Sequence, residues 1–152
     1  MTSPDLPENS QDRRRWMAVL ARATAEELAA AAGERLPAFI RLRGPEAGLV
    51  MLRGRAGGTG RPFNLGEATV VRCTVRTADG WVGHAYCLGR DLRQAELAAA
   101  LDAALQDPAR MQELDAVVIQ PLAAAQASRR ETLSRRAAAT QVQFFTLATM
   151  RS

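Results

Sequence analysis

The sequence predicts an α+β fold in which an antiparallel β-meander of about four strands packs with N-terminal and C-terminal helices. Three observations favour this class. Apolar residues recur at helical spacing near both ends, the middle alternates polar and apolar residues as a strand does, and Asp79-Gly80 between two such runs is typical of a tight hairpin. At 152 residues the chain fits one core. We therefore expect residues 1–10 to form a disordered tail and residues 11–152 a single domain.

Composition excludes several classes of protein. No apolar run approaches the roughly 18 residues that suggest a membrane span, and the polar N-terminus lacks a secretory signal, which predicts a cytoplasmic protein. In that compartment the two cysteines, Cys73 and Cys87, are expected to be free thiols. With one histidine and no Cys-x-x-Cys pair, the sequence predicts no metal site and no cofactor in this chain. The net charge of +4 alone is weak support for nucleic-acid binding, which we do not expect.

Two helices are predicted before residue 34. The first is indicated by the helical spacing of Trp16, Val19 and Leu20, with Asp12 as its expected N-cap. The second begins at the Thr-x-x-Glu pattern of residues 24–27, in which the two side chains satisfy the free amides of the first turn. Gly33 suits the end of that helix.

The strands are predicted from alternation with a period of two. Residues 40–43 and 50–53 are interpreted as two strands joined through Gly44-Pro45. A third strand is expected over residues 68–77, with Val71, Cys73 and Val75 on one face, and a fourth over residues 81–88. The middle of the chain is thus an antiparallel meander.

The C-terminal third is predicted to be mainly helical. Asp91 is expected to cap a helix that covers the sheet, with Gln94 three residues on, and Asp107-Pro108 starts a further helical turn. Residues 117–119 are expected to be briefly extended. A last helix runs from Pro121 toward Gln143 with exposed arginines, and Phe144-Phe145 interrupts the polar pattern near the terminus.

A glycine-rich loop is the strongest local signal for chemistry. Glycine lets the backbone present N–H groups to an anion, and flanking arginines add positive charge. The loop lacks the Gly-Lys-Ser/Thr ending of a phosphate-binding P-loop, however, and no helical pattern follows it. A connection between strands that packs against another chain is the other interpretation. The candidate anion-binding or interface residues in this loop are Arg55, Gly57, Gly58, Thr59 and Gly60.

No complete active site is predicted. His84 lies within a strand, with no acid or nucleophile at recognisable spacing, and is interpreted as structural. Neither cysteine begins a helix, which would lower its pKa. Arg90 and Asp91 precede a helix, where an anion could bind, although a simple cap explains them as well. We therefore assign no catalytic residue.

In their order along the chain these segments resemble the PhnG family, a small subunit of the bacterial carbon-phosphorus lyase core complex. The resemblance covers residues 14–149 and is carried by Trp16-Met17-x-Val19-Leu20-Ala21, Arg55-Ala56-Gly57-Gly58-Thr59-Gly60-x-x-Phe63, Gly66-Glu67-Ala68-Thr69, Gly89-Arg90-Asp91 and Phe144-Phe145-Thr146.

The resemblance implies a non-catalytic subunit of a hetero-oligomer with PhnI, PhnH and PhnJ. That family's complex forms ribose 1-phosphonate 5-triphosphate from ATP and a phosphonate, with PhnI regarded as the catalytic partner and PhnJ as the radical iron-sulfur subunit. ATP and phosphonate would then meet this chain only through the complex. The alternative that we carry forward is an independent nucleotide- or phosphate-binding module that uses the glycine-rich loop.

Overall fold

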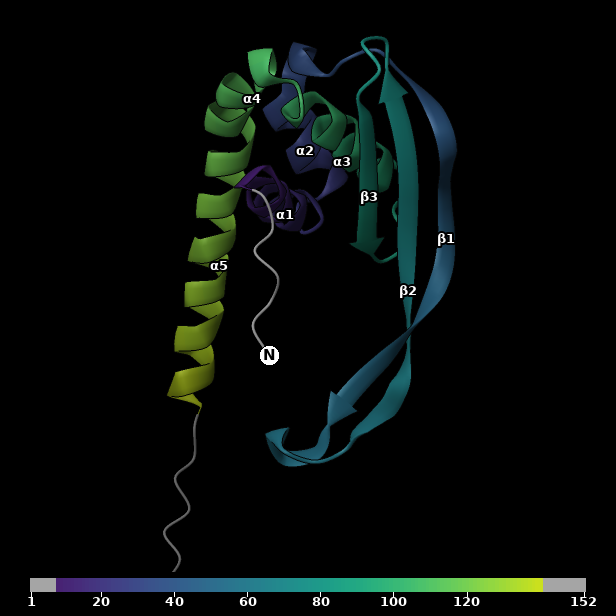
Figure 1. Ribbon diagram of the computed structural model, residues 1–152. Helices are drawn as coiled ribbons and strands as arrows, with labels where there is room; N and C mark the ends of the chain where they lie inside the picture. Colours follow the sequence, from purple (N-terminus) through teal and green to yellow (C-terminus); the bar gives the residue numbers. More distant parts are fainter. Residues whose placement is uncertain (1–7, 141–152) are drawn as a thin grey trace, which may run out of the picture.

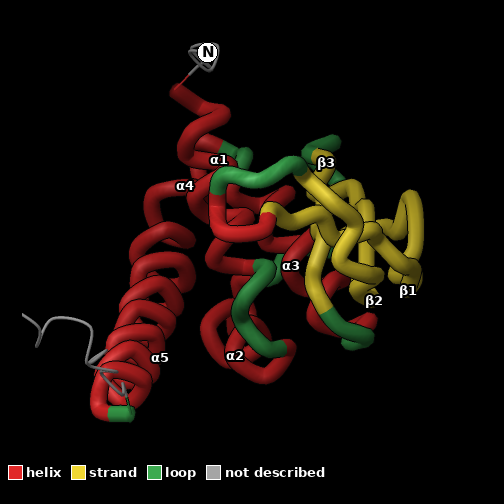
Figure 2. The backbone as a smooth tube through the Cα atoms, turned by 90° about the horizontal axis from the view of Figure 1, so that it is seen from below, coloured by secondary structure: helices red, strands yellow, loops and turns green. Residues whose placement is uncertain are grey.

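The computed structural model describes residues 8–140, which form a helical layer packed on one face of a small sheet (Figures 1 and 2). Among the described residues no helix is both long and apolar enough to span a bilayer. The elements in chain order are α1 (Glu8–Leu20), α2 (Ala25–Ala32), β1 (Phe39–Arg55), β2 (Pro62–Thr77), β3 (Val82–Leu88), α3 (Leu92–Leu105), α4 (Pro108–Leu114) and α5 (Gln120–Ala139).

The sheet is antiparallel with the strand order β1-β2-β3, which confirms the predicted α+β class. It has three strands in the described residues rather than about four, because the segments expected as two strands are one long strand, β1. Gly44-Pro45 interrupts only its register with β2. Proline is tolerated there because β1 is an edge strand, whose outward amides need no partner in the sheet.

The core lies between the sheet and the helices, and α3 is its centre. Nine residues of α3 are buried, most of them alanine, and they pack against the predicted inner face of β2, where Val71, Cys73 and Val75 are buried. β3 approaches α3 so closely that a Cβ on Gly83 would overlap the carbonyl oxygen of Ala99. Small residues on both elements therefore set the spacing of the two layers.

Predicted helix ends that depend on local side chains are confirmed. The Thr24 and Glu27 side chains form the complete capping box of α2, and Gly33 ends that helix with a positive φ. The Asp91 carboxylate accepts a hydrogen bond from the Gln94 amide at 3.0 Å, and Asp107 caps α4. These interactions span only two or three residues, so the sequence shows both partners together.

Several boundaries differ from the prediction. α1 begins at Glu8, which places Asp12 inside the helix rather than at its N-cap. The Gln94 side chain donates to the carbonyls of Ala21 and Ala23 instead of returning to its own helix end.

Residues 117–119 are not extended but belong to a π-helical turn, Asp115–Ile119, between α4 and α5. Burial of Val118 and Ile119 in the core outweighs the strand preference of β-branched residues. The last helix ends at Ala139, and Phe144-Phe145 lies outside the described residues, as do residues 1–7 of the predicted tail.

Candidate interaction site on the hairpin arm

The sheet continues beyond its third strand as a long two-stranded hairpin. β3 pairs with β2 only between Val70 and Arg76, whereas β1 and β2 stay paired as far as Arg55 and Pro62. We call residues 49–69, which include the turn between the strands, the hairpin arm. Figure 1 shows the arm extending past the end of β3 and below α1 and α3.

One face of the arm continues the face that carries the core. Side chains alternate along β2 from Val71 to Glu67, so Thr69 and Glu67 share the side of the buried Val71. Across the pair, Leu49 stands opposite Thr69 and Met51 opposite Glu67, which places both on that side.

A β-bulge at Leu65 breaks the alternation and places Phe63 opposite Gly54. A Cβ on Gly54 would overlap the Leu65 side chain, so Phe63 and Leu65 lie on the other face of the arm. The exposed apolar side chains of both faces, which we call the arm apolar surface, are those of Leu49, Met51, Phe63 and Leu65. Their exposed fractions are 64%, 51%, 46% and 63%. No described helix covers them, although α1 to α3 cover the core-facing side of the sheet beyond the arm. Clustered exposed apolar side chains of this size mark interaction surfaces on soluble domains.

The glycine-rich loop forms the tip of the arm. Gly57 and Gly58 have φ values of 62° and 78°, which side chains other than glycine rarely adopt. A Cβ on Gly60 would stand 2.9 Å from the Ala56 carbonyl oxygen, closer than such atoms approach. These three glycines therefore allow the chain to reverse in a tight turn.

The backbone of the tip is already hydrogen-bonded to itself. The amides of Thr59 and Gly60 both donate to the Ala56 carbonyl oxygen, the latter at 3.1 Å. An anion cradle needs such consecutive amides to be free. This argues against the alternative of an independent phosphate-binding loop and favours a turn that presents the arm.

Positive charge gathers near the tip. Arg53, Arg55 and Arg61 are exposed, and none of them forms an ion pair within residues 11–140. At the base of the sheet, by contrast, Arg41 pairs with Glu96. The hydrogen bond from Arg41 to Glu96 also raises the pKa of Arg41. The arm thus combines an exposed apolar surface with arginines that form no ion pair within residues 11–140.

Arg90 and Asp91 lie apart from the tip. Gly89 beside them donates its amide to the Thr69 carbonyl, seven residues along β2 from Pro62. At strand spacing this separates them from the tip by about 23 Å. Asp91 serves as the cap of α3, and Arg90 is exposed. The structure therefore does not bring the two groups of candidate residues into one site.

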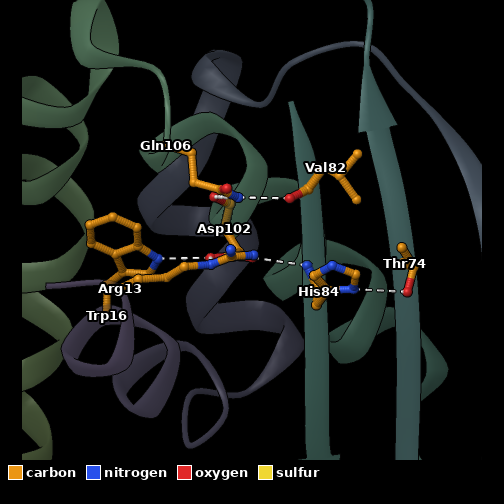
Figure 3. Close-up of polar contacts among 7 residues, drawn as sticks. All are labelled: Arg13, Trp16, Thr74, Val82, His84, Asp102 and Gln106. Carbon is orange, nitrogen blue, oxygen red and sulfur yellow. Dashed lines mark hydrogen bonds and ion pairs between the residues drawn. The ribbon is translucent and has the colours of Figure 1, made fainter. Parts of the chain in front are cut away.

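His84 has no catalytic neighbours among the described residues. Its ring lies on the uncovered outer face of the sheet, where Nδ1 is 3.1 Å from the Thr74 hydroxyl (Figure 3). Both cysteines are free and buried. Burial and the charge of Asp91 raise the pKa of Cys87 to about 11, which makes this thiol a poor nucleophile at neutral pH.

A buried carboxylate that sequence reasoning did not single out joins three elements. Asp102 of α3 is fully buried and accepts hydrogen bonds from Arg13, from Trp16 Nε1 at 2.8 Å and from the His84 amide at 2.9 Å (Figure 3). All of its partners are donors of the protein itself. Asp102 is therefore a structural group, and its only signal in the sequence is an acid within an alanine- and leucine-rich helix.

A metal site is also unsupported within the part of the chain that the structure describes. No group of three or more His, Cys, Asp or Glu side chains is suitably placed there to hold an ion. The residues that stand out are those of the arm. Leu49, Met51 and Leu65 were not singled out from the sequence, although the alternation on both sides of the glycines was visible.

These features define a class of protein: a small α+β domain with a projecting arm that carries exposed apolar side chains. The chain belongs to the PhnG family, since residues 11–150 match the family model described as "Phosphonate metabolism protein PhnG". A relative from Rhizobium meliloti (strain 1021) is the alpha-D-ribose 1-methylphosphonate 5-triphosphate synthase subunit PhnG. It is 48% identical over 137 residues, which cover 89% of this chain and 87% of the relative. The resemblance found in the sequence is confirmed.

Proposed function

We propose that this chain is a non-catalytic subunit of a synthase in phosphonate metabolism and that the hairpin arm holds it to another subunit. The observation that carries the proposal is the arm apolar surface, four exposed apolar side chains on the part of the sheet that continues beyond the helices. The family and the name of the 48% identical relative, a subunit of alpha-D-ribose 1-methylphosphonate 5-triphosphate synthase, support formation of a ribose 1-phosphonate 5-triphosphate as the reaction of that synthase.

The partners we propose are PhnI, PhnH and PhnJ, in a cytoplasmic hetero-oligomer. ATP and the phosphonate would bind through the complex, and this chain would contribute no cofactor. Arg55, Gly57, Gly58, Thr59 and Gly60 would act as interface residues at the tip of the arm. Arg90 and Asp91 would lie at its base, where Asp91 fixes the start of α3.

The exposed area of the arm is large enough to matter energetically. Four side chains that are each about half exposed would contribute roughly 3–7 kcal/mol if a partner buried them fully. This figure is an upper bound, because association also orders side chains and removes translational freedom. A charged substitution within the arm apolar surface should therefore weaken assembly strongly.

Co-purification of the chain with the other synthase subunits tests the proposal. Leu65→Asp should reduce the affinity for the complex at least about 100-fold, because it buries an unpaired carboxylate in an apolar contact. Leu133→Asp is the matched control, since Leu133 on α5 is 65% exposed and Leu65 is 63% exposed. The control should assemble like the unmodified chain.

Two results would contradict the proposal. One is equal assembly of the Leu65→Asp and Leu133→Asp chains. The other is full synthase activity from the isolated chain. Binding of ATP to the isolated chain in calorimetry would instead support the independent nucleotide module. Thermal unfolding of both variants checks that neither substitution disturbs the fold.

A further inference from the structure

The free edge of β3 is partly closed by side chains of α3. His84 donates its amide to Asp102, so its backbone groups point away from β2. In an antiparallel strand every second residue shares that direction, which includes Val82, Tyr86 and Leu88. The Gln106 side chain donates to the Val82 carbonyl at 2.7 Å, as Figure 3 shows. The first half of this edge is therefore capped.

The second half of the same edge is open. Within residues 11–140 no side chain caps the outward backbone groups of Tyr86 as Asp102 and Gln106 cap those of His84 and Val82. Beside Tyr86 runs a groove of about 250 Å³ between α1 and β3, with Met17, Ala18 and Ala98 among its lining residues. An unpaired strand edge next to a groove lined by small apolar residues is the geometry that accepts an added strand.

The chain also carries a segment with the chemistry of an added strand. Residues 137–150 contain no charged side chain, and residues 142–147 read Val-Gln-Phe-Phe-Thr-Leu, a composition that favours strands. This segment follows α5, which rests on the body through Gln126 on Val19 and Arg129 on Glu27. Beyond these contacts the side chains of α5 are exposed.

The segment cannot fill the groove of its own chain. Thr140 lies 14 residues past Gln126, about 21 Å along the helix axis. From Thr140 to Phe144 the extended chain spans at most about 14 Å. It would also have to cross α1, which lies between α5 and β3 in Figure 1 and is roughly 10 Å wide. The chain after Thr140 is therefore too short to lay residues 142–147 along the groove of the same copy.

We propose that the groove beside β3 receives residues 142–147 of a second copy of this chain, which add a fourth strand to the sheet. The exchange is reciprocal, so two copies form a closed pair with two equivalent sites. The segment has no charged side chain to bury in the apolar groove, and its backbone could form hydrogen bonds with the outward backbone groups of Tyr86. This inference does not depend on the arm and goes beyond its proposed role.

Light scattering on the full chain tests the exchange. The unmodified chain should have twice the mass of one chain. The groove variant Ala18→Glu and the tail variant Phe144→Asp/Phe145→Asp should each have half that mass. Gln11→Glu is the matched control, because it adds the same charge to an exposed position of α1 and should leave the dimer intact. Ala18→Leu fills the groove without a charge and should also give a monomer.

A mixing experiment separates exchange from a general loss of stability. The groove variant keeps a normal tail and the tail variant keeps a normal groove, so an equimolar mixture should recover a dimer with one exchanged strand. A monomeric unmodified chain would overturn the proposal, because the two copies would then not exchange this segment. A mixture that stays monomeric would overturn it as well.

Discussion

Removing the charge of Asp102 is the most informative perturbation of the fold. Each carboxylate oxygen accepts two hydrogen bonds, one from the Arg13 guanidinium and one from a buried N–H, that of Trp16 or that of His84. In Asp102→Asn one oxygen becomes an NH₂ group, which faces donors and leaves a buried N–H without a partner. Such a group costs about 1–3 kcal/mol.

Loss of the ion pair adds to this cost. Breaking a buried pair costs about 3–5 kcal/mol, but the Arg13 side chain is 31% exposed and can recover hydration. We therefore expect Asp102→Asn to lower the free energy of unfolding by about 3 kcal/mol. With a urea m-value near 2 kcal/mol/M, the midpoint should fall by about 1.5 M.

An exposed carboxylate serves as the control for Asp102, and a double variant tests its hydrogen bond to Trp16. Glu131→Gln removes an exposed carboxylate that pairs with Arg135 and should cost less than about 0.5 kcal/mol. Trp16→Phe removes one donor, so the double variant Asp102→Asn/Trp16→Phe should be more stable than the sum of the single effects implies. An Asp102→Asn midpoint equal to that of Glu131→Gln would refute the assigned role of Asp102.

Three further predictions concern other parts of the molecule. Gly83→Ala should cost at least about 2 kcal/mol in chemical denaturation because its Cβ would overlap α3, whereas Gly48→Ala, with open space around it, should cost less than about 0.5 kcal/mol. Cys87 should react slowly with Ellman's reagent in the native protein and faster as the pH rises toward its pKa of about 11; a fast reaction at pH 7 would contradict its burial. Hydrogen bonding from Arg129 lowers the pKa of Glu27, so this carboxylate stabilises the fold above its ordinary pKa of 4.5 and loses that contribution as the pH falls through its lowered value. Glu27→Gln should accordingly be less stable than the unmodified chain at pH 7, by under about 1 kcal/mol, and about equally stable in strong acid; a difference in melting temperature that does not change with pH would disprove it.

Local chemistry made part of the fold predictable. Thr24 and Asp91 bond to amides three residues away, so their roles follow from spacing alone. Asp102 could not be found in this way, because its partners Trp16 and Arg13 are 86 and 89 residues distant along the chain. Only the folded arrangement of α1, α3 and β3 brings these groups together.

The arm shows the same limit for the candidate site. Alternation predicted strands on both sides of the glycines, but not that β1 and β2 continue as a pair where β3 ends. Exposure of Leu49 and Leu65 depends on the missing third strand and helices at that level, which is a property of the whole sheet. The glycine-rich loop was recognised correctly as a distinct segment, whereas its internal hydrogen bonds needed coordinates.

Oxidative footprinting of the arm tests the central claim most directly. Met51, Phe63 and Leu65 are exposed in the isolated chain and should be modified readily there. In the assembled synthase the account predicts strong protection of these three side chains, while Leu133 on α5 stays reactive. Equal modification of the arm in the isolated chain and in the complex would contradict the account.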